Sequence, residues 1–307
     1  MDLDLYVTLA GLVVGFVVGM TGMGGGALMT PVLVLLFGVQ PLAAVSSDLV
    51  ASMIMKPVGG AVHLKRGTVH KGLVVWLVAG SVPAAFAGVL LLQALGDGER
   101  VQSLVKVSLG IALLLAVAMM IVRAVLDVRQ RTSDASPATV RVRPVATLIV
   151  GILGGLVVGM TSVGSGSLII VALLMLYPAL KAGDLVGTDL VQAVPLVASA
   201  ALGHLLFGDF QLGLTTSILL GSLPGVYLGA RLSASAPSWL VRRAIAIVLL
   251  ASALKLLEVP TVTVGWILLA VVVVSPFVWS RIRAVLVARS SQPARREPAA
   301  KADAPAR

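Results

Sequence analysis

Residues 15–28 read Gly-Phe-Val-Val-Gly-Met-Thr-Gly-Met-Gly-Gly-Gly-Ala-Leu, and residues 155–168 read Gly-Leu-Val-Val-Gly-Met-Thr-Ser-Val-Gly-Ser-Gly-Ser-Leu. Each stretch starts as an apolar helix and ends in a cluster of small residues. Because Gly lowers helix stability by roughly 1 kcal/mol per residue, a helix does not continue easily through either cluster. The surrounding apolar segments, 5–37 and 145–177, are also longer than the roughly 20 residues of one membrane crossing. We therefore expect a broken helix or re-entrant hairpin in each segment.

The similarity between the two halves continues beyond these stretches, in a register that shifts by one residue. Asp48-Leu49-Val50 matches Asp189-Leu190-Val191 at an offset of 141 residues, whereas the quoted stretches match at an offset of 140. Further matches at the new offset are His63 with His204, Gly67 with Gly208, Gly80-Ser81 with Gly221-Ser222, Pro83 with Pro224, and Gly88 with Gly229. These register-keeping identities indicate an internal duplication.

The composition excludes a water-soluble protein. Hydrophobic residues make up 58% of the 307 residues and charged residues only 12%, whereas soluble domains have about 25% charged residues. The apolar residues lie in nine segments, most of them near the length of a membrane-spanning helix. We therefore expect an all-α polytopic membrane protein. Its predicted parts are a first repeat at 1–123, a cytoplasmic linker at 124–144, a second repeat at 145–258, an extra transmembrane helix at 259–283 and a disordered basic tail at 284–307.

The distribution of charge along the chain, which has a net charge of +10, predicts its orientation in the membrane. Four regions, at 63–71, 123–143, 231–243 and 281–307, together carry +14, and the rest of the chain carries −4. Positive loops are cytoplasmic in membrane proteins, which places the N-terminus outside and the C-terminus in the cytoplasm. A charge spread over short loops also argues against nucleic-acid binding. On this topology His63 and its match His204 fall on opposite sides, so we expect inverted repeats, an architecture typical of secondary transporters.

Inverted repeats with broken helices predict a site for an anion near the middle of the membrane. A helix N-terminus carries about half a positive charge, and each small-residue cluster leads into a short helix. If the hairpins stop midway, two helix ends approach one ligand from opposite sides. The predicted substrate-binding residues are Thr21, Gly22, Gly24, Gly25, Gly26, Ser47, Ser52, Lys56, Thr161, Ser162, Gly164, Ser165, Gly166, Thr188 and Gln192. The candidates for proton coupling are Asp48, Asp189, His63 and His204.

Lys56 is the most unusual of these residues because it lies within an apolar span. A charge at mid-helix costs about 2.5–3.5 kcal/mol on insertion scales, and the other half has Val197 at this position. We interpret Lys56 as a counter-charge for an anion or as a group whose protonation couples transport. The alternatives are an ion pair with Asp48 or a side chain that extends to the membrane surface. For Asp48 and Asp189 the alternative role is capping of a helix N-terminus.

The motif at 15–28, followed by Pro31 and Ser46-Ser47-Asp48, resembles the sulfite exporter TauE/SafE family, and the second motif at 155–168 fits as well. The resemblance covers about residues 7–280. It implies a permease of the bacterial inner membrane for small sulfur-containing anions, such as sulfite or organosulfonates. The second motif departs from the glycine-rich form at Ser162 and Ser165, so the two hairpins are expected to contribute unequally.

We therefore expect a secondary transporter that lies in the lipid bilayer and moves a small anion across it by alternating access. One alternative is an anion channel or a non-transporting membrane subunit. Another is an intramembrane serine hydrolase that would use Ser165 and His204, although the repeat has Gly25 in place of Ser165. We expect a protein that is not an enzyme, with no cofactor and no metal site. The sequence leaves a homodimer open as its assembly.

Overall fold

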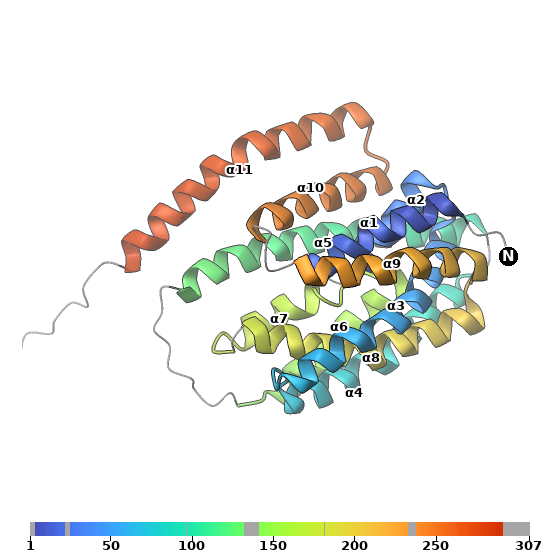
Figure 1. Ribbon diagram of the computed structural model, residues 1–307, viewed down its shortest axis with the longest axis horizontal. Coiled ribbons are helices and arrows are strands. Elements are labelled where there is room, and N and C mark those ends of the chain that lie inside the picture. The colour runs from blue at the N-terminus through green and yellow to red at the C-terminus, as the bar shows by residue number, and fades with distance from the viewer. Residues whose placement is uncertain are drawn as a thin grey trace, which may run out of the picture.

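The computed structural model describes residues 4–21, 25–96, 98–131, 141–180, 182–232 and 238–290, and these form an all-helical protein without a β-strand. The helices lie roughly along one direction, with α11 at the edge of the bundle beside α10 (Figure 1). Their bounds are α1 Leu5–Thr21, α2 Gly26–Leu36, α3 Pro41–Lys65, α4 Lys71–Ala94, α5 Glu99–Arg131, α6 Pro144–Thr161, α7 Leu168–Leu176, α8 Ala182–Phe207, α9 Leu212–Leu232, α10 Ser238–Leu256 and α11 Thr261–Ser290. The predicted all-α fold is confirmed.

Several parts of the chain that the sequence singled out lie outside the described residues. They are Gly22, Gly24, residues 132–140 of the expected linker and residues 291–307 of the expected tail. Helix α5 continues to Arg131 within the linker range, and α11 continues to Ser290 within the tail range. The proposed division into two repeats, a linker, an extra helix and a tail stays a prediction.

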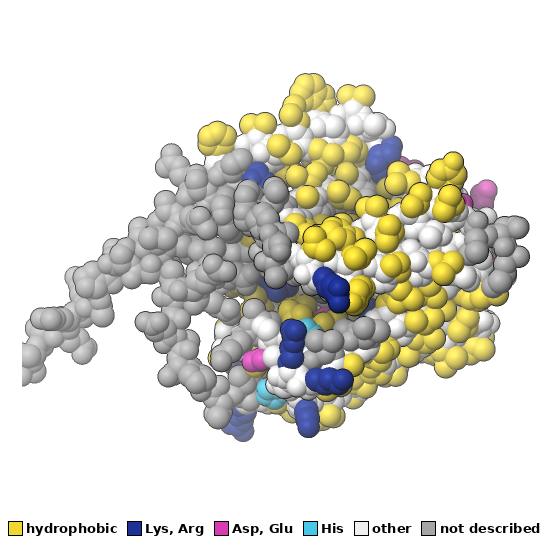
Figure 2. All heavy atoms as spheres, viewed as in Figure 1, with side chains coloured by type: hydrophobic (Ala, Val, Ile, Leu, Met, Phe, Trp, Pro, Cys, Tyr) yellow, Lys and Arg dark blue, Asp and Glu magenta, His cyan; other side chains and the backbone are white. Residues whose placement is uncertain are grey.

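Among the described residues, five helices are long and apolar enough to cross a membrane: Lys71–Ala94, Glu99–Leu126, Pro144–Thr161, Gly183–Phe207 and Leu212–Gly229. Shorter apolar helices accompany them at Leu5–Thr21, Gly26–Leu36 and Thr261–Ser275. Many large hydrophobic side chains are exposed on the outside of the bundle. Figure 2 shows a broad hydrophobic surface, with most of the visible Lys and Arg side chains gathered towards one end of it. The chain is a multi-pass membrane protein.

Both long apolar segments are broken where the small residues cluster. The first segment divides into α1 and α2, and the second into α6 and α7. Helix α2 has 11 residues and α7 has 9, so they are only about 17 and 14 Å long at 1.5 Å per residue. The hydrocarbon core is about 30 Å thick, so neither short helix crosses it.

The two halves pack against each other through pairs of helices that cross at glycines. Helix α1 packs on α9 and helix α6 packs on α4, with close approaches at Gly15 against Ser222 and at Gly155 against Ser81. Because Gly15 matches Gly155 and Ser222 matches Ser81, the same contact is made twice. Small residues let helix backbones approach closely inside a membrane, so these glycines have the packing role expected of such residues.

The central pair of helices, α3 and α8, also consists of matching elements. Ser46 near the start of α3 lies against His204 near the end of α8, whereas Gly60 near the end of α3 lies against Leu190 and Val194. The two helices therefore run in opposite directions. This arrangement agrees with a two-fold relation between the halves; the inversion of the repeats across the membrane stays a prediction.

We predict that Gly15→Ala destabilises the protein by about 1–3 kcal/mol, the usual cost of overfilling a packed contact. A Cβ atom at Gly15 would lie 2.5 Å from the carbonyl oxygen of Ser222 and 2.8 Å from its Cα. The matched control is Gly265→Ala in α11, where a Cβ meets nothing within 4 Å. The measurement is the melting temperature of both purified variants in detergent. An equal melting temperature for Gly15→Ala and wild type would contradict this account of the crossing.

Candidate functional site

The small-residue clusters of the two hairpins meet inside the bundle. A Cβ atom at Gly26, the first residue of α2, would lie 2.5 Å from Oγ of Ser162 and also against the Ser162 carbonyl oxygen. Ser162 is the C-cap residue that follows the end of α6. The two breaks therefore lie side by side and not at opposite faces of the membrane. This is the arrangement that a shared site requires.

The loop from Ser162 to Ser167 folds back tightly between α6 and α7. Ser162 has φ 60°, Gly164 φ 134° and Gly166 φ 98°, all in the left-handed region. Glycine adopts such values without strain, which explains why two of these positions are Gly. Ser162, in contrast, adopts a conformation that costs an L-residue about 1–2 kcal/mol. The loop thus has a defined shape that a helix cannot provide.

This loop contacts three of the five ionisable residues of the predicted site on α3 and α8, namely Asp48, Lys56 and Asp189. Oγ of Ser162 donates to Oδ2 of Asp48 at 2.6 Å, Nζ of Lys56 donates to Oγ of Ser165, and the backbone N–H of Gly166 donates to the carboxylate of Asp189. Asp48 and Asp189 are buried, with exposed fractions of 0% and 1%. Lys56 interacts electrostatically with both carboxylates. The loop between α6 and α7 therefore unites the charged residues of both halves.

Asp48 has two hydroxyl donors on one oxygen and none on the other. Besides Ser162, Oγ1 of Thr30 donates to Oδ2 at 3.2 Å. The other oxygen, Oδ1, is buried and has no hydrogen-bond partner among the described residues. Asp48 lies seven residues after Pro41, the first residue of α3, so it does not cap this helix. The capping alternative is therefore wrong for Asp48.

Asp189 has a different set of partners. Nε2 of Gln192 donates to its Oδ1 at 2.9 Å, and Gln192 in turn accepts at Oε1 from Oγ of Ser81 at 3.3 Å. Both Lys56 and Arg123 of α5 lie within electrostatic reach of its carboxylate. Because α8 begins at Ala182, Asp189 is also inside its helix, and the capping alternative is wrong here too.

The other predicted hydroxyl groups are engaged locally or are not part of this cluster. Oγ1 of Thr21 donates to Val17 O at 2.8 Å, and Oγ1 of Thr161 donates to Val157 O at 2.6 Å, each within its own helix. Oγ1 of Thr188 accepts from the backbone N–H of His70 at 3.0 Å. Ser47 and Ser52 are buried on α3, and Oγ of Ser47 has no partner among the described residues. Their roles as ligands stay predictions.

The two matched histidines have unequal surroundings. His204 is fully buried, with Nε2 at 2.8 Å from Gly159 O and Nδ1 at 2.8 Å from Ser46 Oγ. A carbonyl only accepts, so Nε2 carries the proton and Nδ1 accepts from the serine hydroxyl. His63 is half-buried at the end of α3, with Nδ1 2.9 Å from Thr68 Oγ1. The structure does not bring either ring to the loop that contacts Lys56.

Three residues of the cluster were not predicted from the sequence: Thr30, Ser81 and Arg123. Ser81 lies in the duplicated Gly-Ser motif, and its match Ser222 is buried with no partner among the described residues for its Oγ. The first half has Ala51 where the second half has Gln192, so Ser222 lacks the amide that binds Ser81. Gln192 is a polar residue that the first repeat lacks, and this difference between the repeats was a signal for the contact between Gln192 and Ser81. Thr30 and Arg123 carried no such signal.

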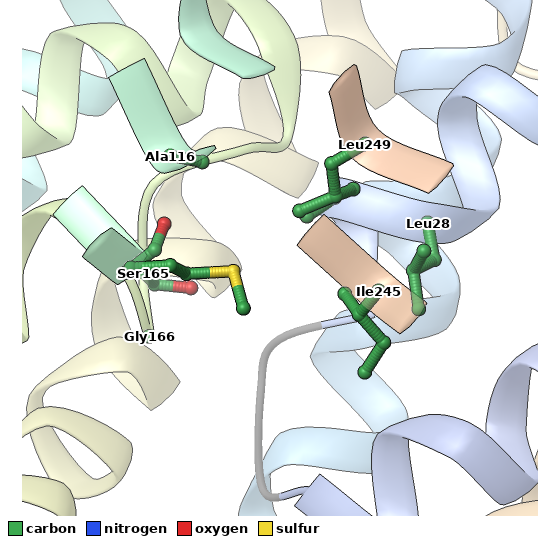
Figure 3. Close-up of a pocket in the computed structure, with 9 residues that line it drawn as sticks. Leu28, Ala116, Ser165, Gly166, Ile245 and Leu249 are labelled. Atoms are coloured by element: carbon green, nitrogen blue, oxygen red, sulfur yellow. The ribbon is translucent and has the colours of Figure 1, made fainter. Parts of the chain in front are cut away.

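A small cavity lies beside the loop. It has a volume of about 10 Å³ and is lined by Ser165, Gly166 and Ser167 together with apolar residues of α2, α5 and α10. Figure 3 shows Ser165 and Gly166 on one side of the opening, and Leu28, Ile245 and Leu249 on the other. A single water molecule needs about 10–15 Å³. In this conformation the cavity is therefore too small for an anion.

We predict that Gly26→Ala separates the two hairpins, because its Cβ has no room against Ser162. The expected result is a loss of stability of about 1–3 kcal/mol from overpacking, measured as a lower melting temperature in detergent. The neighbouring variant Gly25→Ala is the matched control, since a Cβ there meets only Met55 Cε, at 3.9 Å. If both variants melt alike, the hairpins do not meet as described.

Comparisons with known proteins agree with this architecture. The profile of the family described as "Sulfite exporter TauE/SafE" matches residues 7–256. The chain is 36% identical over 256 residues to "Probable membrane transporter protein YjnA" of Bacillus subtilis (strain 168), covering 83% of this chain and 100% of that protein. It is 23% identical over 249 residues to "Probable membrane transporter protein YdhB" of the same organism, covering 78% of this chain and 95% of that protein. No solved structure matches the chain.

The match to the family extends over both broken segments and over the helices that carry Asp48, Lys56 and Asp189. It ends at Leu256, the last residue of α10, so α11 lies outside it. The duplicated glycine motif that suggested the resemblance is thus part of the matched region. The chain belongs to the sulfite exporter TauE/SafE family of membrane transporters.

Proposed function

We propose that this protein is a secondary transporter that moves a small sulfur-containing anion, such as sulfite or an organosulfonate, by alternating access. The observation that carries the proposal is the meeting of the two hairpins at Gly26 and Ser162, beside a loop that binds Lys56. A broken helix is tolerated at membrane depth where it lines a site. The sulfur chemistry of the substrate is suggested by the family description.

The positive groups near the loop suit an anion. Helices α2 and α7 begin at the loops, and neither Gly25 nor Ser167 at their N-caps makes a side-chain capping hydrogen bond. The dipole of each helix attracts negative charge at its N-terminus, although the N–H groups of Leu168 and Ile169 in α7 already donate to Gly164 O. Lys56 adds a full charge from α3. An oxyanion between these three donors would replace the hydroxyl of Ser165 as the partner of Lys56.

The arrangement of the acids suits alternating access. Asp48 and Asp189 each lie seven residues from the first residue of α3 and α8, or about 10 Å at 1.5 Å per residue. Because these helices are antiparallel, the two carboxylates lie towards opposite ends of the bundle. Because the cavity beside the loop is too small for an anion, the helices around it must move before an anion enters or leaves. Such motion of one repeat against the other is typical of inverted-repeat transporters.

The hydrolase alternative has less support. Ser165 is bound by Lys56, whereas His204 uses its two nitrogens for Ser46 and Gly159. These contacts do not pair Ser165 with His204, so the two residues that this alternative would use do not form a dyad. For the location we propose the bacterial inner membrane, with the N-terminus outside and the C-terminus in the cytoplasm, from the distribution of basic loops.

We predict that the purified protein in liposomes takes up labelled sulfite or small sulfonates with saturable kinetics. In the Lys56→Gln variant, uptake should fall by about ten- to a hundredfold, because a hydrogen bond to a charged group contributes about 1.5–3 kcal/mol. The matched control is Lys106→Gln, which removes a half-buried lysine paired with Glu258 at 2.8 Å. This control should transport at the wild-type rate.

Two results would contradict the proposal. Uptake that does not saturate would indicate a channel, and wild-type uptake by Lys56→Gln would show that the lysine does not hold the anion. A panel that includes sulfate, nitrate and phosphate tests the sulfur preference separately. The melting temperature of each variant shows whether a loss of uptake reflects unfolding.

A further inference from the structure

We propose that a cleft at the start of α6 binds the phosphate headgroup of an anionic phospholipid, with an acyl chain along the exposed apolar face of α6. The cleft has a volume of about 510 Å³ and lies between residues 141–143, before α6, and residues 176–179, at the end of α7. Ligand sites usually have volumes of about 300–1,000 Å³. Helix α7 begins at the loop of the anion site and ends about 14 Å away at this cleft, so the two sites are separate. The proposed function does not depend on the lipid.

A buried tyrosine fixes the two walls of the cleft to each other. Tyr177 directly follows α7, and its hydroxyl oxygen accepts from the backbone N–H of Arg143 at 2.8 Å. The same oxygen lies 2.6 Å from Oγ1 of Thr147 in the first turn of α6. Pro178 and Ala179 follow with short, exposed side chains. The cleft is therefore a fixed part of the hairpin formed by α6 and α7.

Two arginines give the cleft a positive charge. Arg141 and Arg143 are exposed, and no acidic side chain among the described residues forms an ion pair with either guanidinium group. Helix α6 begins beside them at Pro144, so the positive end of its dipole adds to their charge. A guanidinium group binds phosphate oxygens through parallel N–H donors. The phosphodiester of a lipid headgroup suits this pair of arginines.

An exposed apolar stripe on α6 starts next to these arginines. Val145, Ile149 and Leu153 are 70%, 49% and 60% exposed, and their spacing of four residues places them on one face of the helix. Because α6 is long and apolar enough to cross a membrane, this face meets acyl chains. Val145 lies two residues after Arg143, so the charged and the apolar parts of the site are contiguous. Basic pockets beside membrane-spanning helices bind anionic headgroups, whereas a soluble anion would gain nothing from the stripe.

The test follows the melting temperature of the purified protein in dodecyl maltoside as dioleoyl-phosphatidylglycerol or dioleoyl-phosphatidylcholine is added. The anionic lipid should raise the melting temperature by about 2–4 °C, and the zwitterionic lipid should leave it unchanged. Glycerol phosphate, which has the charge of the headgroup but no acyl chain, should have no effect at the same concentrations. An equal rise with phosphatidylcholine would show that the charge is not recognised, and an equal rise with glycerol phosphate would show that a soluble anion suffices. Either result, or no rise with any probe, would overturn the proposal.

The double variant Arg141→Gln/Arg143→Gln locates the lipid. Both side chains are exposed, and Tyr177 binds the backbone of Arg143, so the contact between the walls does not depend on the replaced groups. The phosphatidylglycerol concentration at half of the full temperature shift should rise about thirtyfold when both arginines are lost. The matched control is Lys65→Gln/Arg66→Gln, which changes two neighbouring exposed basic residues at the end of α3 and should keep the wild-type midpoint. An unchanged midpoint in the arginine variant, or an equal change in both variants, would overturn the assignment to this cleft.

Discussion

Two carboxylates and a lysine are held inside an apolar helix bundle by the loop between α6 and α7, and the rest of the structure depends on this contact. Ser162, Ser165 and Gly166 each bind one of the three charged residues. Buried charges without partners are strongly destabilising, so the loop must hold its shape. That shape comes from positive φ angles at Ser162, Gly164 and Gly166 and from the contact with Gly26.

The packing of the helices has approximate two-fold symmetry, whereas the polar residues of the site differ between the two halves. The crossings at Gly15 and Gly155 repeat the same contact, and α3 and α8 are matched and antiparallel. Lys56, however, matches Val197 in the sequence of the other half, and Gln192 matches Ala51. The frame is therefore nearly symmetric, whereas the lysine and the amide are each present in one half only. An asymmetric site suits a ligand that carries one charge.

Much of the fold was predictable from the sequence because the bilayer constrains it. Apolar length and the glycine clusters predicted the all-α membrane fold and both helix breaks, which the structure confirms at Thr21 and Thr161. The sequence did not decide whether the two hairpins meet, because no sequence pattern shows whether each hairpin stops midway through the membrane or crosses it fully. Contacts between helices were less accessible: Thr30 reaches Asp48, and Arg123 lies near Asp189, through side chains far apart in the chain. The capping roles failed because α3 and α8 begin earlier than the apolar pattern suggested.

The position of the anion tests the central claim most directly. Crystals of the protein with 2-bromoethanesulfonate would locate the ligand through the anomalous scattering of bromine. The account predicts a peak next to Lys56 and the Ser162–Ser167 loop, between the N-termini of α2 and α7, and no peak there in Lys56→Gln. A peak only at exposed arginines, for an anion that the liposomes show to be transported, would contradict it.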